Sequence, residues 1–138
     1  MRRAAVLLPL CQERGETRVL FTRRTDTVEH HKGQISLPGG REDAGDSGLL
    51  ATALRETEEE LGIPPDRIEI LGALDDVYTV VSGFVITPYV GVLPQPIPLR
   101  ISPHEIAEVL TVPLSTFRDP SRVRVEERER EGERIQVY

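Results

Sequence analysis

The stretch GGREDAGDSGLLATALRETEEELGI, residues 39–63, predicts one amphipathic helix that follows a glycine-rich loop. Asp46 and Ser47 are the candidates for its N-cap, because a side-chain oxygen at that position accepts a first-turn N–H that otherwise has no partner. Gly62 can adopt the left-handed conformation that ends a helix, and the two prolines after Ile63 prevent its continuation. The helix is therefore expected between these two signals.

One face of this helix is apolar. Leu50, Leu54, Thr57 and Leu61 recur at spacings of four, three and four residues, and Ala53 lies beside them. At 3.6 residues per turn these side chains share one side of the helix. We expect this side to pack on the core.

Another face carries carboxylates. Glu56 and Glu60 are four residues apart, so one lies a turn above the other, and Glu59 lies beside them. Like charges at this spacing cost roughly a few tenths of a kcal/mol per pair, and a solvated acidic face is the simpler interpretation. The glycine-rich loop favours another one, since backbone carbonyls beside stacked carboxylates offer an all-oxygen site for a hard divalent cation such as Mg²⁺.

The same residues resemble the signature of the Nudix hydrolases, which is Gly, five residues, Glu, seven residues, and Arg-Glu-aliphatic-any-Glu-Glu-any-Gly-aliphatic. Gly40 matches the first glycine, and residues 55–63 (RETEEELGI) match the end. Asp46 stands in place of the isolated Glu, with eight rather than seven residues before Arg55, and Thr57 replaces an aliphatic residue.

A motif before the helix narrows the resemblance. Residues 20–40, LFTRRTDTVEHHKGQISLPGG, resemble the motif of the coenzyme A (CoA) pyrophosphatase subfamily, approximately Leu-Leu-Thr-any-Arg-Ser, a spacer, and His-any-Gly-Gln-any-any-Phe-Pro-Gly-Gly. The matching residues are Leu20, Thr22, Arg24, His31, Gly33, Gln34, Pro38, Gly39 and Gly40. Thr25 replaces Ser and Leu37 replaces Phe. The extra residue before Arg55 is normal for that subfamily, so it supports the narrower assignment.

This resemblance, together with the chemistry of the side chains, implies roles for the helix residues. Glu56 and Glu60 are expected to hold Mg²⁺ or Mn²⁺, with the carbonyl of Gly40 completing the metal's shell, and the bound cation lowers the pKa of an attacking water. Glu59 is expected to be a second metal ligand or the general base. Arg55 is expected to orient the carboxylates by ion pairing.

By the same resemblance, the enzyme is a metal-dependent pyrophosphohydrolase that cuts CoA or acyl-CoA to 3′,5′-ADP and 4′-phosphopantetheine. The residues expected to hold the substrate's phosphates are Arg24, His31, Lys32 and Gln34. Zinc is disfavoured at the two adjacent histidines, because their side chains diverge and no third soft ligand is near. Glu105 is a further candidate for the base, with a helix cap as the alternative.

Two other functions stay open. One is a Nudix hydrolase of another nucleoside diphosphate derivative, such as ADP-ribose or NADH. The other is a Nudix domain that binds a ligand or regulates without turnover. The complete set of Glu56, Glu59 and Glu60 argues against the second, because a pure binding domain does not need the full metal site.

The composition fits a small globular protein. A chain of 138 residues suits a single Nudix domain, 1–138, with its own core. The net charge of −6 gives no overall bias toward nucleic acid. Cys11 is the only cysteine, which excludes an intramolecular disulfide, favours a cytoplasmic location and suggests a small buried hydrophobe. No segment is long enough to span a membrane, and a homodimer stays open.

The remaining chain predicts strands around this helix. Residues 4–10 are apolar but short and contain a proline, so we expect a buried strand rather than a secretory signal. Further strands are expected at residues 18–23, 34–37, 67–73 and 84–93, and a Pro-Gly-Gly turn at 38–40. Residues 102–105 are expected to open a short helix that continues through 106–110.

The tail, residues 122–138, is expected to form a charged hairpin about Gly132, with a single charged helix as the alternative. These elements predict an α+β fold, and the resemblance implies the Nudix α/β/α sandwich around a mixed β-sheet. Members of the subfamily usually continue past such a tail into an aromatic-rich segment and a last helix. That C-terminal helix is missing here, which a truncation, a partner subunit or a shorter natural form would each explain.

Overall fold

The structure is a computed structural model, and it describes residues 2–25, 33–80, 83–117, 126–130 and 133–137. Its elements, in chain order, are β1 (Arg2–Glu13), β2 (Glu16–Arg24), β3 (Ile35–Ser36), β4 (Gly39–Arg41), α1 (Leu49–Leu61), the 3₁₀ turn η1 (Pro65–Arg67), β5 (Glu69–Ala73), β6 (Val77–Thr79), β7 (Phe84–Val92), β8 (Ile106–Pro113), the 3₁₀ turn η2 (Leu114–Phe117), β9 (Glu126–Arg130) and β10 (Glu133–Val137).

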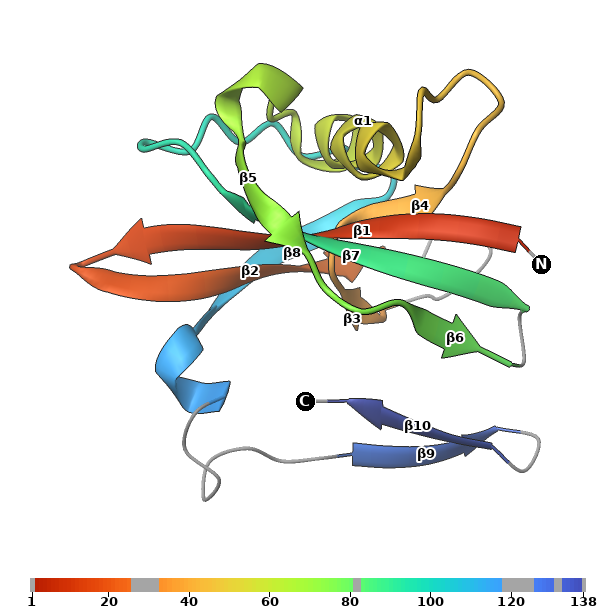
Figure 1. Cartoon of the computed structure of the whole chain (residues 1–138). Coiled ribbons are helices and arrows are strands. Elements are labelled where there is room, and N and C mark those ends of the chain that lie inside the picture. The colour runs from red at the N-terminus through yellow and green to blue at the C-terminus, as the bar shows by residue number, and fades with distance from the viewer. Residues whose placement is uncertain (1, 26–32, 81–82, 118–125, 131–132, 138) are drawn as a thin grey trace.

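A mixed sheet is built around β1 (Figure 1). In the described part of the chain its main order is β3-β2-β1-β7-β5, while β4 pairs with β1, β6 with β7 and β8 with β2. β1 and β7 are parallel, and the other pairs in this sheet are antiparallel. β1 has partners on both edges and is rich in buried apolar residues, which explains its nearly continuous apolar sequence.

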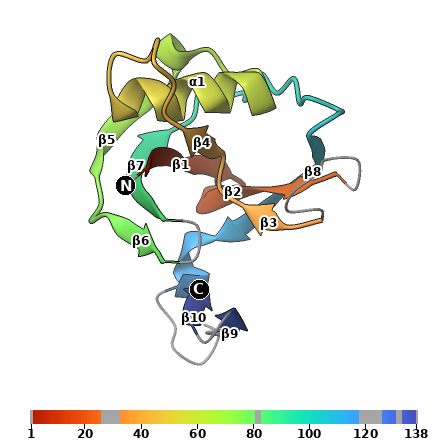
Figure 2. The same ribbon diagram turned by 90° about the vertical axis from the view of Figure 1, so that its right-hand side faces the viewer.

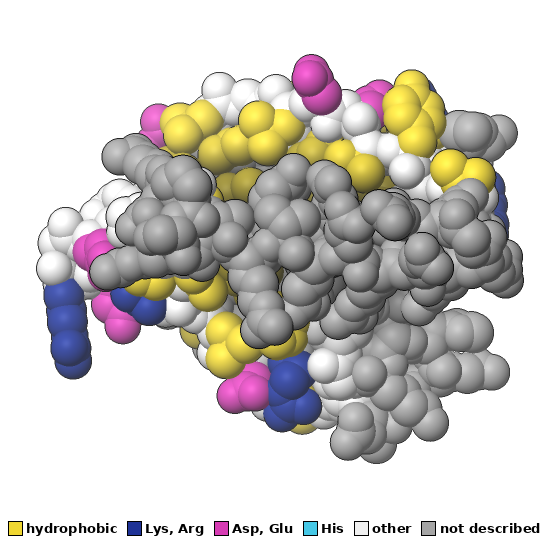
Figure 3. Space-filling model, turned by 90° about the horizontal axis from the view of Figure 1, so that it is seen from below, with side chains coloured by type: hydrophobic (Ala, Val, Ile, Leu, Met, Phe, Trp, Pro, Cys, Tyr) yellow, Lys and Arg dark blue, Asp and Glu magenta, His cyan; other side chains and the backbone are white. Residues whose placement is uncertain are grey.

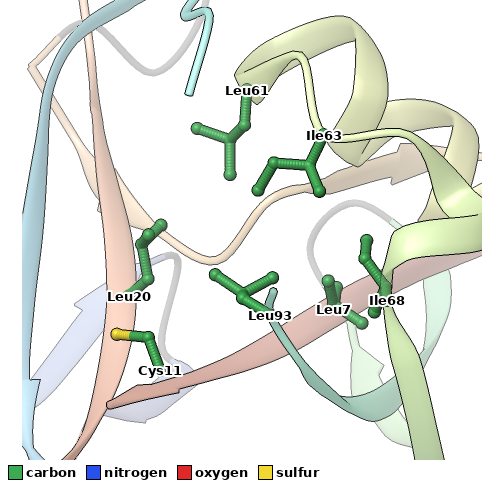
Figure 4. Close-up of a cluster of buried hydrophobic side chains, with 7 residues drawn as sticks. All are labelled: Leu7, Cys11, Leu20, Leu61, Ile63, Ile68 and Leu93. Carbon is green, nitrogen blue, oxygen red and sulfur yellow. The ribbon is translucent and has the colours of Figure 1, made fainter. Parts of the chain in front are cut away.

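Helix α1 lies across one face of the sheet, above β1 and β4 (Figures 1 and 2). The predicted apolar face is confirmed, because Ala53, Thr57 and Leu61 are buried, whereas Leu50 and Leu54 are partly buried. The core between helix and sheet contains the side chains shown in Figure 4: Leu7, Cys11, Leu20, Leu61, Ile63, Ile68 and Leu93. Cys11 is thus a buried apolar residue near the end of a strand, as expected.

The two ends of α1 differ in how well the sequence predicted them. Gly62 ends the helix in the left-handed conformation, with φ 75°, and its N–H donates to the Glu58 carbonyl at 2.8 Å. The predicted N-cap is wrong. Gly48 occupies that position, and neither Asp46 nor Ser47 provides a capping side chain. The Asp46 carboxylate has stronger partners elsewhere, described below.

The short helix predicted from residue 102 is also wrong. The Ser102 carbonyl accepts the N–H groups of Glu105 and Ile106, which makes one turn, and the chain then continues as β8. β8 pairs with β2 from Arg18↔Pro113 to Arg24↔Ile106. The edge of β2 supplies backbone partners along the whole segment, and the β-branched residues of β8 favour a strand.

Two other segments also differ from expectation. Gly39 and Gly40, which were expected in a turn at 38–40, belong to β4 (Gly39–Arg41) and pair with β1. The connection before β7 contains β6, which was not predicted. In the tail, β9 and β10 form the expected antiparallel hairpin, whereas Gly132 lies outside the described residues.

The α+β class with a mixed sheet is confirmed, and α1 covers one face of that sheet. Among the described residues no α-helix other than α1 is present. Figure 3 views the opposite side of the molecule, where hydrophobic side chains are visible. No helix in the described part of the chain has both the length and the apolar character needed to cross a membrane.

Candidate functional site

Two carboxylates of α1 face the glycine pair of β4. The Glu60 side chain is buried, and the Gly39 N–H donates to Glu60 Oε2 at 3.2 Å. Glu56 lies so close to Gly40 that a Cβ added at position 40 would collide with the end of its carboxylate. Glycine at position 40 therefore lets the helix bring a carboxylate against the strand backbone.

Burial makes both carboxylates hard to ionise in the metal-free protein. It raises the pKa of Glu60 to about 8 and that of Glu56 to about 7. The charge of Glu59 raises the pKa of Glu56 further, and that of Glu105 raises both. Such a pair is stabilised in its charged form by an added cation, and carboxylate oxygens are ligands that Mg²⁺ and Mn²⁺ prefer.

Arg55 connects the glycine-rich loop to the carboxylates. Its Nε donates to Asp46 Oδ1 at 2.8 Å and its Nη2 to Asp46 Oδ2 at 3.1 Å. Its Nη1 lies 3.3 Å from Glu59 Oε1 and 3.4 Å from Glu56 Oε2. This guanidinium holds the pKa of Asp46 well below its usual range. Asp46 is thus the fixed partner of Arg55, which is why it does not cap the helix.

Thr52 and Thr57 show how the helix accommodates polar residues beneath this site. The Thr52 hydroxyl donates to Asp46 Oδ2 at 2.8 Å. Thr57, which replaces an aliphatic residue of the signature, is fully buried and donates to the Ala53 carbonyl at 2.7 Å. Each hydroxyl has an acceptor, so neither is an unsatisfied buried polar group.

Glu59 is more exposed than the other two carboxylates. Its side chain is 55% exposed and contacts Arg55. Across the described residues, no three His, Cys, Asp or Glu side chains converge as they stand on a point where a metal ion would bind. The oxygen donors of Glu56 and Glu60 fit a hard cation, but a third carboxylate has to rotate to join them.

The position of Glu105 near the carboxylates was the hardest to predict from the sequence. It lies in the turn before β8, and its backbone carbonyl accepts the Thr25 N–H at 3.0 Å. Its charge raises the pKa of both Glu56 and Glu60, so its carboxylate lies near theirs. The pattern from Ser102 to Glu105 suggested a capping box instead. Only the pairing of β8 with β2 brings Glu105 near the site.

The predicted phosphate ligands are only partly described. Arg24 ends β2, and its Nε is buried without a hydrogen-bond partner. The positive charge of Arg24 lowers the pKa of Glu60, so its guanidinium lies near that carboxylate. Gln34 is exposed, and its carbonyl accepts the Arg24 N–H at 2.9 Å. His31 and Lys32 lie outside the described residues.

Comparison with known proteins gives a family. Residues 1–131 match the NUDIX domain. The chain is 43% identical over 114 residues to the uncharacterized Nudix hydrolase NudL of Cronobacter sakazakii, which covers 83% of this chain and 58% of that protein. It is 40% identical over 137 residues to the NudL of Photorhabdus laumondii, covering 99% of this chain and 72% of that protein. The chain spans less than two thirds of the length of the first of these relatives.

Solved structures share the fold. An Ap4A hydrolase of C. elegans in a binary complex superposes with a TM-score of 0.68 at 21% identity, covering 83% of this chain and 82% of that one. The NUDIX domain of Shewanella oneidensis NrtR, complexed with ADP ribose, superposes with a TM-score of 0.61 at 21% identity, covering 83% and 74%. With the family match over nearly the whole chain and relatives above 40% identity, this chain belongs to the Nudix domain family.

Proposed function

We propose that this chain is a Nudix hydrolase that cleaves the pyrophosphate bond of CoA or an acyl-CoA. Addition of one water breaks one P–O bond of the diphosphate and releases 3′,5′-ADP and 4′-phosphopantetheine. The observation that carries the proposal is the buried pair of Glu56 and Glu60 against β4, with Gly40 leaving room for the carboxylate. A single domain, residues 1–138, would carry this activity.

A divalent cation, Mg²⁺ or Mn²⁺, when bound here supplies charge to the phosphate oxygens and a water of lowered pKa. Glu56 and Glu60 would hold it, with the carbonyl of Gly40 and a rotated Glu59 as further oxygen ligands. Arg55 holds two members of this set, Glu56 and Glu59, because it is itself anchored by two hydrogen bonds to Asp46. Removing that anchor leaves these two carboxylates without a fixed neighbour.

Two carboxylates compete for the role of general base. Glu59 is exposed and near Arg55, whereas Glu105, in the turn before β8, lies near enough to the carboxylate pair to raise the pKa of both. A base must reach the attacking water in the bound complex, and rotation of an exposed side chain can provide that reach. Comparing Glu59→Gln with Glu105→Gln decides between them, since loss of the base removes the rise of kcat with pH that its ionisation causes, and an excess of metal does not restore it.

Arg24 supports a phosphate-bearing substrate. A buried N–H without an acceptor costs about 1–3 kcal/mol, and a phosphate oxygen is a strong acceptor for a guanidinium. The CoA assignment rests on the motif that contains Arg24 and Gln34. His31 and Lys32 stay predicted phosphate ligands of the same motif.

The alternative substrates are ADP-ribose and NADH, and the alternative class is a Nudix domain without turnover. The NUDIX domain of NrtR was solved with ADP ribose, so this ligand deserves a direct comparison. It shares the diphosphate and the adenosine with CoA but has no 3′-phosphate. The test below separates these possibilities.

The test is product analysis of the purified chain with CoA, ADP-ribose and NADH, each with Mg²⁺ or Mn²⁺. Glu60→Gln is the inactive variant, and Glu58→Gln is the matched control, because Glu58 is an exposed residue of the same helix. Formation of 3′,5′-ADP from CoA that is lost only in Glu60→Gln supports the proposal. Cleavage of ADP-ribose with intact CoA overturns the substrate, and binding without turnover of any of the three overturns the enzyme.

A further inference from the structure

The turn that carries Glu105 is bonded to the C-terminal end of α1. The Ser102 N–H donates to the Glu60 carbonyl at 2.9 Å, and the Arg100 N–H donates to the Leu61 carbonyl at 2.7 Å. The last carbonyls of a helix have no partner within the helix, so these two bonds complete the end of α1. The chain that leads to Glu105 is therefore fixed beside the backbone of Glu60.

Gly62 permits this close approach. A Cβ added at position 62 would lie 2.6 Å from the Cβ of Arg100 and 2.7 Å from its carbonyl oxygen. Any other residue at position 62 would push the strand-like segment away from the helix. The contact between the end of α1 and the chain before Glu105 is thus tight.

Thr25 holds the other side of the same turn. Thr25 directly follows β2, and its hydroxyl donates to the His104 carbonyl at 2.6 Å while its N–H donates to the Glu105 carbonyl at 3.0 Å. The Glu105 N–H donates to the Ser102 carbonyl at 3.1 Å. The backbone of Glu105 is therefore bonded on both sides, at its N–H and at its carbonyl.

A β-bulge next to Thr25 explains why a side-chain bond is needed here. The register of β2 against β8 shifts between Arg23 and Arg24, where Ala107 is an extra residue of β8. A bulge disrupts the backbone ladder and redirects the residues beyond it, and bulges are frequent beside active sites. The Thr25 hydroxyl adds a constraint on the 102–105 turn at the point where the ladder is interrupted.

The turn held in this way brings a third carboxylate to the pair of Glu56 and Glu60. The Glu105 side chain is partly buried, and its charge raises the pKa of both members of the pair, so it lies near them. Because the same turn is bonded to the Glu60 backbone and to Thr25, a displaced turn would move Glu105 relative to Glu60. A misplacement of about 1 Å in an active site can cost on the order of a hundredfold in rate.

We propose that Thr25 is a positioning residue, whose hydroxyl holds the 102–105 turn so that the Glu105 carboxylate stays beside the carboxylate pair during hydrolysis. This inference rests on the proposed function, because it assigns Glu105 to the same site. Valine has nearly the shape of threonine but has no O–H to donate to the His104 carbonyl. Serine keeps that donor, and it is the residue of the subfamily motif at this position.

Steady-state kinetics of Thr25→Val, Glu105→Gln and the double variant test the proposal, on whichever diphosphate substrate the unmodified chain cleaves. We expect Thr25→Val to lower kcat about tenfold with KM changed by less than about twofold, and Thr25→Ser to keep kcat within about threefold of the unmodified value. In the Glu105→Gln background, Thr25→Val should lower kcat no further, since residues that act through one group are not additive. Thr17→Val is the control, because the Thr17 hydroxyl accepts a hydrogen bond from Gln12 at the other end of β2.

Several outcomes overturn the proposal. Unchanged kcat in Thr25→Val or in Glu105→Gln does so, as does an equal fall caused by Thr25→Val with and without Glu105. A rise of KM alone assigns Thr25 to substrate binding beside Arg24 and also overturns it. Thr25→Ala removes the hydroxyl without placing a methyl group against the carbonyl, and it takes the place of Thr25→Val if thermal unfolding shows that the valine variant is not folded.

Failure of the proposed function gives a different result. The unmodified chain then cleaves none of the diphosphate substrates, and the inference falls with the function. When the inference alone fails, the unmodified chain and Thr25→Val cleave the substrate at the same rate, or the two substitutions act independently of each other.

Discussion

Asp46 and Arg55, nine residues apart, form a two-point hydrogen bond that joins the loop before α1 to the middle of the helix, with contacts of 2.8 and 3.1 Å. The side chain of Asp46 is 6% exposed and that of Arg55 is 27% exposed. Arg55 reaches Glu56 and Glu59 from this fixed position. Asp46 therefore fixes the position of the guanidinium, and the guanidinium in turn orients the carboxylates of Glu56 and Glu59.

Arg55→Lys tests this arrangement. Lysine keeps the charge but cannot make the two parallel hydrogen bonds, so we expect kcat to fall about tenfold or more while the protein stays folded. Arg67→Lys, at an exposed position, is the control. Steady-state kinetics with circular dichroism measure both effects. Unchanged kcat in Arg55→Lys would show that charge alone is sufficient.

Alanine substitutions at three glycines distinguish a loss of stability from a loss of metal binding and activity. In Gly40→Ala the new Cβ collides with the flexible end of Glu56, so we expect a folded protein with metal affinity and activity reduced about tenfold to a hundredfold. In Gly39→Ala the Cβ collides with the backbone of Ala5 and Val6, so we expect loss of stability. Gly45→Ala has nothing within 4 Å of the new Cβ and is the control.

Thermal unfolding and metal titration by calorimetry measure these three variants. A Gly40→Ala protein that binds metal as the unmodified chain does would contradict the close approach of Glu56. A stable Gly39→Ala protein would contradict the contact of β4 with β1.

The metal-free protein is expected to lose stability as the pH rises from about 5 to about 8. Burial raises the folded-state pKa of Glu60 to about 8 from an ordinary value of 4.5. Between these values the unfolded chain releases the proton and the folded protein keeps it, so the free energy of unfolding falls with rising pH, by on the order of a few kcal/mol. Denaturant unfolding in chelator at several pH values measures this.

Glu60→Gln should remove much of that pH dependence, because the amide does not ionise, and Glu58→Gln should leave it in place. Saturating Mg²⁺ should restore stability at pH 8 in the unmodified protein and not in Glu60→Gln. The same slope in Glu60→Gln as in the unmodified protein would locate the pH dependence elsewhere.

Cys11 should react slowly with thiol reagents in the folded protein. Its side chain is buried, and burial and the nearby charge of Glu13 raise the pKa of the thiol. Since the thiolate is the nucleophile, we expect alkylation by iodoacetamide to be about a hundredfold slower than in denaturant. Mass spectrometry follows one modification per chain, because the sequence has a single cysteine. Similar rates in both conditions would contradict its burial.

Ile106→Ala tests the placement of β8. Ile106 is 1% exposed, so its truncation should cost about 2–5 kcal/mol in the free energy of unfolding. Leu99→Ala, at a side chain that is 43% exposed, should cost about 1 kcal/mol or less and is the control. Chemical denaturation measures both values. Equal losses would contradict the burial of Ile106 in β8.

The sequence alone determined α1, its apolar face and the stacking of Glu56 and Glu60. These features depend on contacts between residues three and four apart, which helical periodicity fixes. The end of the helix could also be predicted, because glycine adopts the left-handed conformation seen at Gly62 more readily than other residues do.

Tertiary structure decided the rest. Asp46 had a local role available as a cap, but the guanidinium of Arg55 is a stronger partner for its carboxylate. Residues 106–110 were predicted to continue a short helix, but the edge of β2 supplied backbone partners along their length. That pairing also brought Glu105 to the carboxylates, and the parallel pairing of β1 with β7 placed Arg2 beside Phe84. Each of these outcomes depends on residues far apart in the chain, and their pairing energy outweighed the local preference that the sequence displays.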